Sequence, residues 1–421
     1  MRLIKLISIL LLISLTFAFK LNAQENEGNK EIEEVKSHVE SMDENLTALL
    51  GDVAGLKKIK ISGYLQINFE KSEASKGFFM NPYDSTDFVQ ARFRVRRSRI
   101  KVAYDAGITQ FVVQGDFSNA GFELKDAYLS LTCPWTKAWD FQAGVFNRPN
   151  YEVEYSSSQR ESMERSLVVR TLYPGERDLG IMATIHPNDW FKLQLAGFNN
   201  TFQGTYKQNG PNFNNEPLYF MARLTKEFAF QDLGLGLDLG AHLRYGNVVS
   251  NTNKLLESDV ATKAAADTVS LKKGDKVGRT WFGFEAQLFY DLFGGMKLMG
   301  EYIMGNDVNQ LGTAGSKTNG PAIRKRSFNG FYVMLVKNIT EEFQFAVKYD
   351  SYNPNTKIDA SKIDNVNELT VNTLGLGLHN YTFENIRISL WYDMITTKTK
   401  TGLIEKDPID NLLTVRFQYK F

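Results

Sequence analysis

Strict alternation of apolar and polar residues at the carboxyl end of the chain restricts the fold most. From Leu413 to Phe421, apolar side chains occupy every second position, and polar or charged side chains occupy the positions between them. A period of two is typical of a β-strand with two different faces. We expect this aromatic-rich strand to close a membrane-spanning barrel, because a closed barrel leaves no unpaired strand edge in lipid. The residues expected to signal to barrel-assembly machinery are Phe417, Tyr419 and Phe421.

The same period of two continues through most of the chain from Ile59 onward. Short candidate turns alternate with longer polar connections, which is the arrangement of outer-membrane barrels. A soluble, exported antiparallel sheet is the alternative, because its wet face would also tolerate the charges opposite each apolar stripe. The segments predicted as sixteen strands are 59–70, 88–106, 109–118, 122–132, 139–146, 178–186, 190–199, 218–228, 234–245, 280–291, 296–305, 327–338, 342–352, 367–381, 384–396 and 411–421.

The composition agrees with a barrel and excludes several other classes. Hydrophobic residues make up 43% of the chain and charged residues 23%, whereas a multi-helix membrane protein would be far more apolar. A single cysteine excludes an internal disulfide, and the four histidines are too far apart in sequence to suggest metal-ligand spacing. We therefore predict an all-β protein with no metal, no cofactor and no catalytic residue.

Residues 1–23 are predicted to be a secretory signal. Arg2 and Lys5 supply its positive end, an apolar run follows, and Ala23 is a small residue at the expected cleavage site. The alternative is a retained anchor helix, although the apolar run is short for crossing a membrane. Removing the signal takes the formal charge from +1 to about −2, so bulk charge does not predict a nucleic-acid partner.

Residues 24–58 are predicted to contain a coiled-coil helix in the periplasm. Apolar residues recur with alternating spacings of three and four, which is typical of a heptad repeat and implies an oligomer. A trimer would suit a barrel of this kind, and the alternative is an amphipathic helix packed on its own domain. The heptad positions are Ile32, Val39, Leu46 and Val53 at a, and Val35, Met42, Leu49 and Leu56 at d.

The most basic stretch of the predicted barrel, residues 59–421, is a cluster between residues 92 and 101. Its parity changes near Arg96 and Arg97, and a β-bulge there would let all the cations face one watery lumen. Such a row would attract anions. The compatible alternative is that these arginines pair with carboxylates such as Asp116, Asp126 and Asp140. The pore-lining candidates are Arg92, Arg94, Arg96, Arg97, Arg99 and Lys101.

The segment 147–177 lies between two predicted strands and carries equal numbers of basic and acidic residues. A connection of this length that folds into a barrel would narrow it, and its guanidinium groups would offer paired hydrogen bonds to phosphate or carboxylate. The alternative is an ordered loop held by internal ion pairs. The constriction candidates are Arg148, Arg160, Arg165, Arg170 and Arg177, with Glu152, Glu154, Glu161, Glu164 and Glu176 as the acidic set.

Five short motifs occur in order between residues 96 and 180. They are Arg96-Arg97-Ser98-Arg99-Ile100, Leu124-Lys125-Asp126-Ala127-Tyr128, Gly144-Val145-Phe146-Asn147-Arg148-Pro149, Glu164-Arg165 and Glu176-Arg177-Asp178-Leu179-Gly180. This series resembles the phosphate-selective porin O and P family. The N-terminal helix and the Asn22-Ala23-Gln24 at the signal end also resemble porins of this family from Bacteroidota-type bacteria. The resemblance implies a sixteen-stranded trimeric anion channel in the outer membrane, with selectivity from an arginine ladder and from lysines at the mouth. The Arg92–Arg99 cluster is a partial counterpart of that ladder.

The expected function is passive diffusion of small anions, with phosphate and polyphosphate among the candidates. The expected partners are outer-membrane lipid, further copies of the chain in a homotrimer, barrel-assembly machinery and the permeating anions. A general channel, or one for sugars or organic anions, is the nearest alternative. A structural barrel and a barrel enzyme are further alternatives, although His186, His242 and His379 lack a local catalytic partner motif.

Overall fold

The computed structural model describes the side chains and backbone of most of the barrel region. The described residues are 38, 41–42, 44, 55–73, 91–118, 121–199, 218–250, 254–257, 259, 269–272, 274–291, 294–310, 323–359, 363, 368–397 and 410–421.

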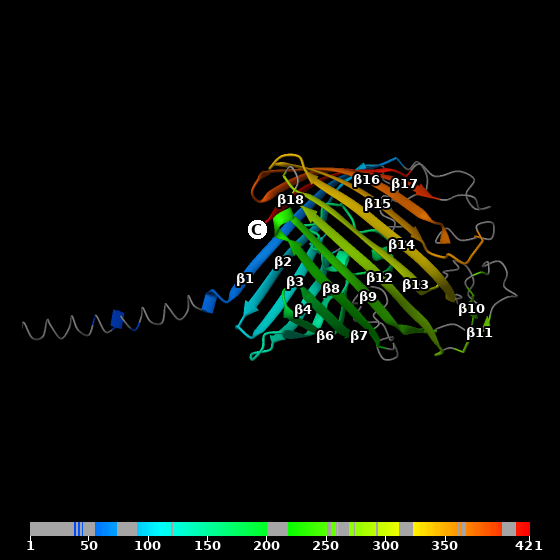
Figure 1. The fold of residues 1–421 in the computed structure, drawn as a ribbon, viewed down its shortest axis with the longest axis horizontal. Helices are drawn as coiled ribbons and strands as arrows, with labels where there is room; N and C mark the ends of the chain where they lie inside the picture. Colours follow the sequence, from blue (N-terminus) through cyan, green and yellow to red (C-terminus); the bar gives the residue numbers. More distant parts are fainter. Residues whose placement is uncertain are drawn as a thin grey trace, which may run out of the picture. The chain divides into compact units, whose positions relative to one another are not determined.

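Residues 61–421 form a closed antiparallel barrel. The sheet of the described residues contains eighteen strands, of which β10 and β11 are short pairings in one long connection and the other sixteen form the wall. Successive wall strands pair with one another, β9 pairs with β12, and β1 pairs with both β2 and β18, so the ring has no open edge. Figure 1 shows the wall strands lying obliquely side by side around the barrel. The all-β barrel predicted from the period of two is thus confirmed.

The wall strands match the predicted segments closely. The clearest differences are extensions of β9, β12, β13 and β14 at the ends that meet the long connections. The wall strands are β1 (Ile59–Ser72), β2 (Ala91–Asp105), β3 (Thr109–Ser118), β4 (Gly121–Thr132), β5 (Trp139–Asn147), β6 (Arg177–Asn188), β7 (Phe191–Phe198), β8 (Tyr219–Phe230), β9 (Leu235–Val249), β12 (Lys276–Tyr290), β13 (Met296–Gln310), β14 (Ile323–Asn338), β15 (Phe343–Asn353), β16 (Val371–Phe383), β17 (Ile386–Thr397) and β18 (Leu412–Lys420).

Four shorter elements lie in the connections. Two helices, α2 (Tyr151–Glu154) and α3 (Leu167–Leu172), occupy the segment between β5 and β6, and η1 (Gln231–Leu233) forms the turn between β8 and β9. The short strands β10 (Lys254–Leu256) and β11 (Val269–Ser270) pair with each other between β9 and β12.

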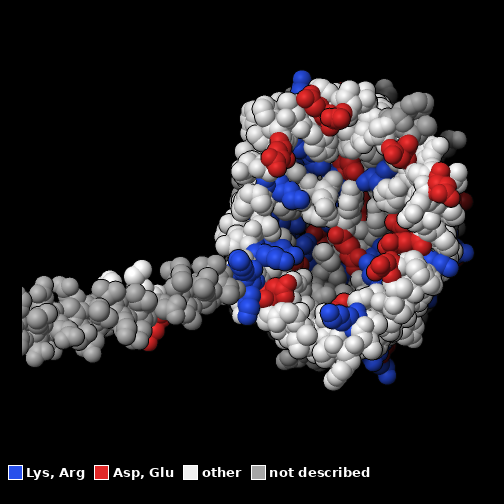
Figure 2. Space-filling model, turned by 60° about the vertical axis from the view of Figure 1, so that its left-hand side comes forward, with Lys and Arg blue, Asp and Glu red and all other residues white. Residues whose placement is uncertain are grey.

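Inward and outward faces of the wall differ in chemistry as the alternation predicts. On β12, Phe282 and Phe284 are exposed on the outer face, whereas Arg279 and Glu285 are buried on the inner face. An apolar outer band suits lipid, and polar inner side chains suit a watery interior. Figure 2 shows a hollow at one end of the barrel, with basic and acidic side chains gathered inside it.

Strand β18 closes the barrel against β1 in a continuous register. Tyr419 lies opposite Leu65, and Phe417 lies opposite Ile67. Phe421 and Gly63 exchange two backbone hydrogen bonds of 3.0 Å, which extends the pairing beyond the strand ends. The three aromatic residues predicted as the assembly signal, Phe417, Tyr419 and Phe421, are all exposed on the outer face.

Most of the N-terminal prediction lies outside the described residues. This includes the whole of the predicted signal, residues 1–23, and most of the predicted coiled coil. The described residues His38, Ser41, Met42 and Glu44 are helical. Within the described part of the chain, no helix combines the length and the apolarity that crossing a membrane requires.

Candidate functional site in the barrel lumen

The segment between β5 and β6 folds into the lumen and contacts the wall on many sides. Glu152 on α2 accepts a hydrogen bond of 3.0 Å from Lys348 on β15. Glu154 accepts one of 2.6 Å from Arg223 on β8. Glu161 accepts one of 2.6 Å from Lys297 on β13. Residues 148–176, called the inserted segment below, therefore occupy the space that an open barrel would leave for solvent.

Glu152 holds the two helices of the inserted segment together. Its carboxylate is buried and accepts two hydrogen bonds of 2.9 Å from the backbone N–H of Ser166 and one of 2.6 Å from the Ser166 hydroxyl. Ser166 is the residue before α3, so the carboxylate satisfies a backbone donor that has no partner inside the helix. Asn150 caps α2 in the usual way, since its side chain accepts a hydrogen bond from Val153 N–H.

One side of the lumen is filled by an apolar, largely aromatic cluster. Val168, Val169, Leu172 and Tyr173 of the α3 region pack against inward residues of several strands. Trp281 on β12 donates a hydrogen bond of 3.0 Å to the Tyr173 hydroxyl. The cluster packs α3 against the wall. Its wall members are Phe146, Met182, Ala196, Phe198, Tyr219, Met221, Trp281, Ile303, Phe328 and Tyr352.

Gly330 allows α3 to approach the wall closely, and this gives a prediction. A Cβ atom at Gly330 would lie 2.7 Å from Cβ of Val168. We expect Gly330→Ala to lower the free energy of unfolding by about 1–3 kcal/mol, because the added methyl group overpacks this contact. Urea unfolding followed by tryptophan fluorescence measures the effect. Gly278→Ala is the matched control, because a Cβ there meets nothing within 4 Å; equal effects of the two substitutions would contradict the close approach.

The opposite side of the inserted segment is polar and contacts β1, β2 and β18. Ser157 bonds to the Tyr64 hydroxyl at 2.6 Å, and its carbonyl accepts a hydrogen bond of 2.9 Å from Gln66. The Ser158 carbonyl accepts one of 2.9 Å from Gln418. This row of hydrogen bonds joins the inserted segment to the seam where the barrel closes.

Glu164 extends this contact by gathering three arginines. It accepts hydrogen bonds from Arg96 at 2.7 Å and from Arg97 at 3.0 Å, and Arg416 on β18 lies 3.6 Å away. Burial alone would raise the pKa of the Glu164 carboxyl, but the three arginines outweigh burial and hold the pKa well below its usual range. The carboxylate therefore stays charged at neutral pH and in mild acid. Its contribution to the fold is present above the usual carboxyl pKa and is lost as the pH falls below it.

The predicted pore-lining arginines on β2 all face the interior and meet carboxylates. Arg92 and Arg94 both contact Glu70 on β1, at 3.1 and 2.7 Å. Both residues at the predicted change of parity, Arg96 and Arg97, contact Glu164. Arg99 contacts Asp116 at 2.8 Å. Of the three aspartates suggested as partners, Asp116 is the one that pairs with this cluster among the described ion pairs. Asp126 pairs with Arg177 instead, and Asp140 pairs with His186.

Lys101 differs from the arginines that precede it on β2. It makes no ion pair with another described residue, and it lines a cavity in the lumen. The sequence pattern placed Lys101 in the same row as the arginines, but it could not distinguish a paired cation from an unpaired one.

The five constriction candidates, four in the inserted segment and Arg177 at the start of β6, mainly make contacts within the protein. Arg165 donates to the carbonyls of Glu152 and Val153 and pairs with Glu176. Arg148 donates to the carbonyls of Pro174 and Glu176, and Arg160 donates to the carbonyls of Ser162 and Met163. Arg177 pairs with the carboxylates of Asp126 and Glu176. Arg170 lies in the last turn of α3.

Two cavities lie between the inserted segment and the wall; both reach β1 and β2, the first extends toward β3–β6 and the second toward β15–β18. The first, of about 310 Å³, is lined by residues near the beginning of β1 and the end of β18, including Lys101 and Lys420. The second, of about 300 Å³, is lined near the beginning of β18 by Leu412 and Thr414. The two cavities therefore lie toward opposite ends of the lumen, and Arg165 lines both. The seam contacts of Ser157 and Glu164 lie between these ends.

The first cavity is basic, whereas the second is balanced in charge. The charged residues that line the first cavity are Arg99, Lys101, Arg165, Arg177 and Lys420 against Asp126 and Glu154. Those that line the second cavity are Arg94, Arg96, Arg165, Arg170 and Lys348 against Glu70, Glu164, Asp350, Asp393 and Asp410.

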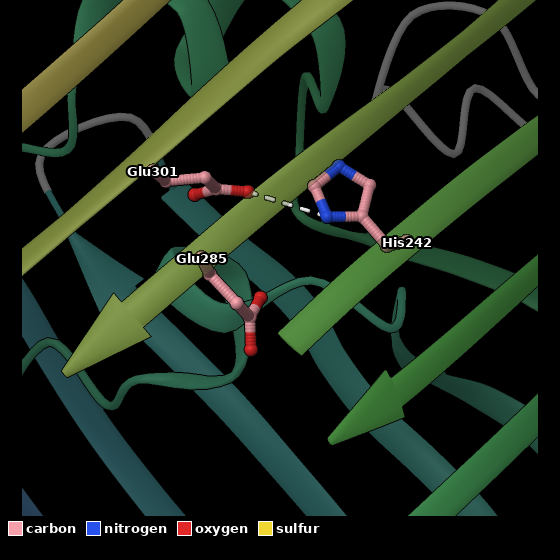
Figure 3. A group of neighbouring side chains, drawn as sticks. All are labelled: His242, Glu285 and Glu301. Carbon is pink, nitrogen blue, oxygen red and sulfur yellow. Dashed lines mark ion pairs between the residues drawn. The ribbon is translucent and has the colours of Figure 1, made fainter. Parts of the chain in front are cut away.

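The structure also brings together three side chains that the sequence did not connect. His242 on β9, Glu285 on β12 and Glu301 on β13 lie side by side on the inner face of the wall (Figure 3). Metal-ligand spacing within one segment could not reveal this group, because each residue comes from a different strand. The signal that could have found it is two inward-facing glutamates and a histidine on three consecutive wall strands.

Known proteins resemble this chain in sequence over the barrel region and in fold. A family model described as phosphate-selective porin O and P matches residues 59–421. The comparison with curated proteins finds no match. The outer membrane channel DcaP of Acinetobacter baumannii is 14% identical, with 86% of this chain and 97% of that chain covered and a TM-score of 0.56. OprB of Pseudomonas putida is 11% identical, with 89% of this chain and 96% of that chain covered and a TM-score of 0.59. At these identities the likeness concerns the fold.

Proposed function

The chain belongs to the phosphate-selective porin O and P family and forms an outer-membrane porin channel, and on that premise we propose that it passes small anions by passive diffusion. Phosphate is the candidate substrate that the description of the family suggests, and polyphosphate is a further candidate. The pathway follows the polar side of the lumen, between the inserted segment and the β1–β2 wall, since the other side is packed with apolar residues.

The basic lining of the first cavity is the observation that carries the anion preference. Five basic and two acidic side chains line it, and Lys101 and Lys420 make no ion pair with another described residue. An unpaired ammonium group in a confined space attracts anions and repels cations. We therefore assign the selectivity mainly to these two lysines.

The arginines on β2 are proposed to shape the pathway more than to select ions. Each of the five contacts a carboxylate at 2.7–3.1 Å, but together they share three carboxylates, Glu70, Glu164 and Asp116. A cation that has such a partner contributes less to the field on a passing anion than an unpaired one. This pairing favours a second candidate function, a general diffusion channel with weak selectivity, which the following experiment separates from the first.

Reversal potentials in a salt gradient test the proposal. We expect the wild-type channel in a planar bilayer to prefer chloride over potassium, and Lys101→Gln with Lys420→Gln to lower that preference. A unit charge about 10 Å from an ion in water is worth ~0.4 kcal/mol, or about twofold in permeability ratio for each lysine. Lys226→Gln is the matched control, because Lys226 is exposed and contacts Trp190 away from the lumen.

Cation preference in the wild-type channel would overturn the anion proposal and leave the channel itself standing. An unselective wild-type channel that the double substitution does not change would favour the general diffusion channel. Competition by phosphate for the chloride current, measured in the same bilayer, tests phosphate as a substrate.

We propose that the chain lies in outer-membrane lipid as a homotrimer and is inserted by barrel-assembly machinery, as its sequence predicts. The exposed apolar outer face suits contact with outer-membrane lipid, and the exposed aromatic residues of β18 suit recognition by barrel-assembly machinery. The heptads within residues 24–58 support a periplasmic coiled coil and a homotrimer after removal of residues 1–23. Chemical cross-linking of the intact protein, with and without residues 24–58, tests the oligomer.

A further inference from the structure

We propose that His242, Glu285 and Glu301 form a binding site for one divalent transition-metal ion on the inner wall of the barrel. The ligand atoms of the three residues all lie within 4.8 Å of one another. Nδ1 of His242 lies 3.5 Å from Oε1 of Glu301. Figure 3 shows the Glu301 carboxylate directed toward the His242 imidazole, with the Glu285 carboxylate below them in this view.

The register of the strands creates this group. Glu285 on β12 lies directly opposite Glu301 on β13, and Gly283 on β12 lies directly opposite His242 on β9. Like charges in directly opposite positions destabilise a sheet. A cation bound between the two carboxylates converts this repulsion into attraction.

Two glycines leave room for the ligands. A Cβ atom at Gly283 would lie 2.3 Å from Cε1 of His242, and one at Gly240 would lie 2.5 Å from Oε1 of Glu285. The His242 and Glu285 side chains therefore each lie over a glycine of the adjoining strand. Two such glycines side by side allow the imidazole and the carboxylate to lie along the wall instead of projecting into the lumen.

Several polar atoms of the group are buried and lack hydrogen bonds among the described residues. Both ring nitrogens of His242 and Oε2 of Glu301 have no hydrogen-bond partner. His242 and Glu301 are each 3% exposed. A buried polar atom without a hydrogen-bond partner is unfavourable, so three of them in one group indicate a site that favours a ligand.

Among the described ion pairs, Glu301 meets no lysine or arginine, so a bound cation would supply the charge partner that it lacks. Arg223 bonds to Glu285 at 2.6 Å, but it also bonds to Glu154 at 2.6 Å. Glu301 accepts a hydrogen bond from the neutral amide of Asn150. Arg223 and Asn150 would also orient the two ligand carboxylates, as groups outside a metal's own ligands commonly do.

The donor set indicates the class of metal. One imidazole nitrogen and two carboxylate oxygens suit Zn²⁺ and similar first-row ions, whereas Mg²⁺ prefers oxygen ligands and retains its water. Because Asn150 caps α2, a metal at Glu301 would also strengthen the link between the wall and the inserted segment.

Titration of the folded, tag-free protein with ZnCl₂ tests the site. After treatment with a chelator, we expect calorimetry to show one Zn²⁺ per chain and no binding of Mg²⁺ under the same conditions. His242→Gln and Glu301→Gln should each weaken Zn²⁺ binding at least about tenfold. The matched control is His379→Gln, since His379 is also a buried wall histidine but bonds to Ser389 at 2.8 Å.

Co²⁺ absorption provides a second readout that identifies the ligands. We expect visible d–d bands in the wild type and in His379→Gln, and their loss in His242→Gln. Retention of folded mobility on unheated gels shows that a variant still forms the barrel, and Glu301→Gln keeps the test valid if His242→Gln does not fold. Equal Zn²⁺ binding by the wild type, His242→Gln and Glu301→Gln would overturn the proposal. Loss of binding with His186→Gln, which alters the surface pair with Asp140, would also overturn it.

Discussion

Replacement of residues 157–164 by a short glycine–serine link is expected to raise single-channel conductance several-fold and to increase anion preference at the same time. These residues join the inserted segment to the seam of β1, β2 and β18, between the two cavities. Their removal widens the pathway. It also removes Glu164 and so releases the charge of Arg96 and Arg97 into the lumen. Conductance and reversal potential in planar bilayers measure the two effects.

Glu164→Gln separates the two effects of this replacement. The amide keeps the size of the side chain but removes its charge, so anion preference should rise while conductance stays close to that of the wild type. A deletion of equal length in the connection between β7 and β8 controls for shortening the chain. Unchanged conductance after replacement of residues 157–164 would show that ions take a different route through the barrel.

Glu152→Ala is expected to have the largest effect on stability. The substitution leaves Lys348 buried without its closest carboxylate and leaves the backbone N–H of Ser166 without an acceptor. Loss of one partner of a buried ion pair typically costs 3–5 kcal/mol. Urea unfolding in detergent should therefore show a large decrease in the free energy of unfolding, with early release of the inserted segment.

Two further variants make the prediction for Glu152 specific. Glu152→Ala combined with Lys348→Met should be less destabilised than Glu152→Ala alone, because the double variant leaves no unpaired ammonium group in the wall. Glu123→Ala is the control, since the Glu123 side chain is 50% exposed in its pair with Lys125 and such pairs contribute little. Equal losses in Glu123→Ala and Glu152→Ala would contradict the structural role of Glu152.

The wall of the barrel was predictable because its signal is local. Each strand alternates between lipid-facing and lumen-facing residues, and this period is visible within a few residues of sequence. The strand ends beyond the lipid were less predictable, because there the outer face no longer has to be apolar. Thus β12 begins at Lys276 and β14 at Ile323, each four residues before the predicted start.

The interior of the barrel was only partly predictable, because its contacts join distant residues. The helices α2 and α3 have four and six residues, too few to form without tertiary contacts, and the sequence predicted a loop there. The row of cations on β2 was visible in the sequence, but its partners Glu70 and Glu164 were not. The histidine–glutamate group depends on the register of three strands, which a pattern within one strand does not contain.

The seam between β1 and β18 has a consequence for the order in which the protein folds. The hydrogen bond from Gln66 to Gln418 joins residues 352 positions apart. Contacts of such long range make folding slow, because the whole intervening chain must be ordered before they form. Until then, β1 presents an unpaired edge that could join a strand of another chain. Barrel closure is therefore a late step, and we expect its kinetics to depend on a factor that shields β1 until β18 arrives.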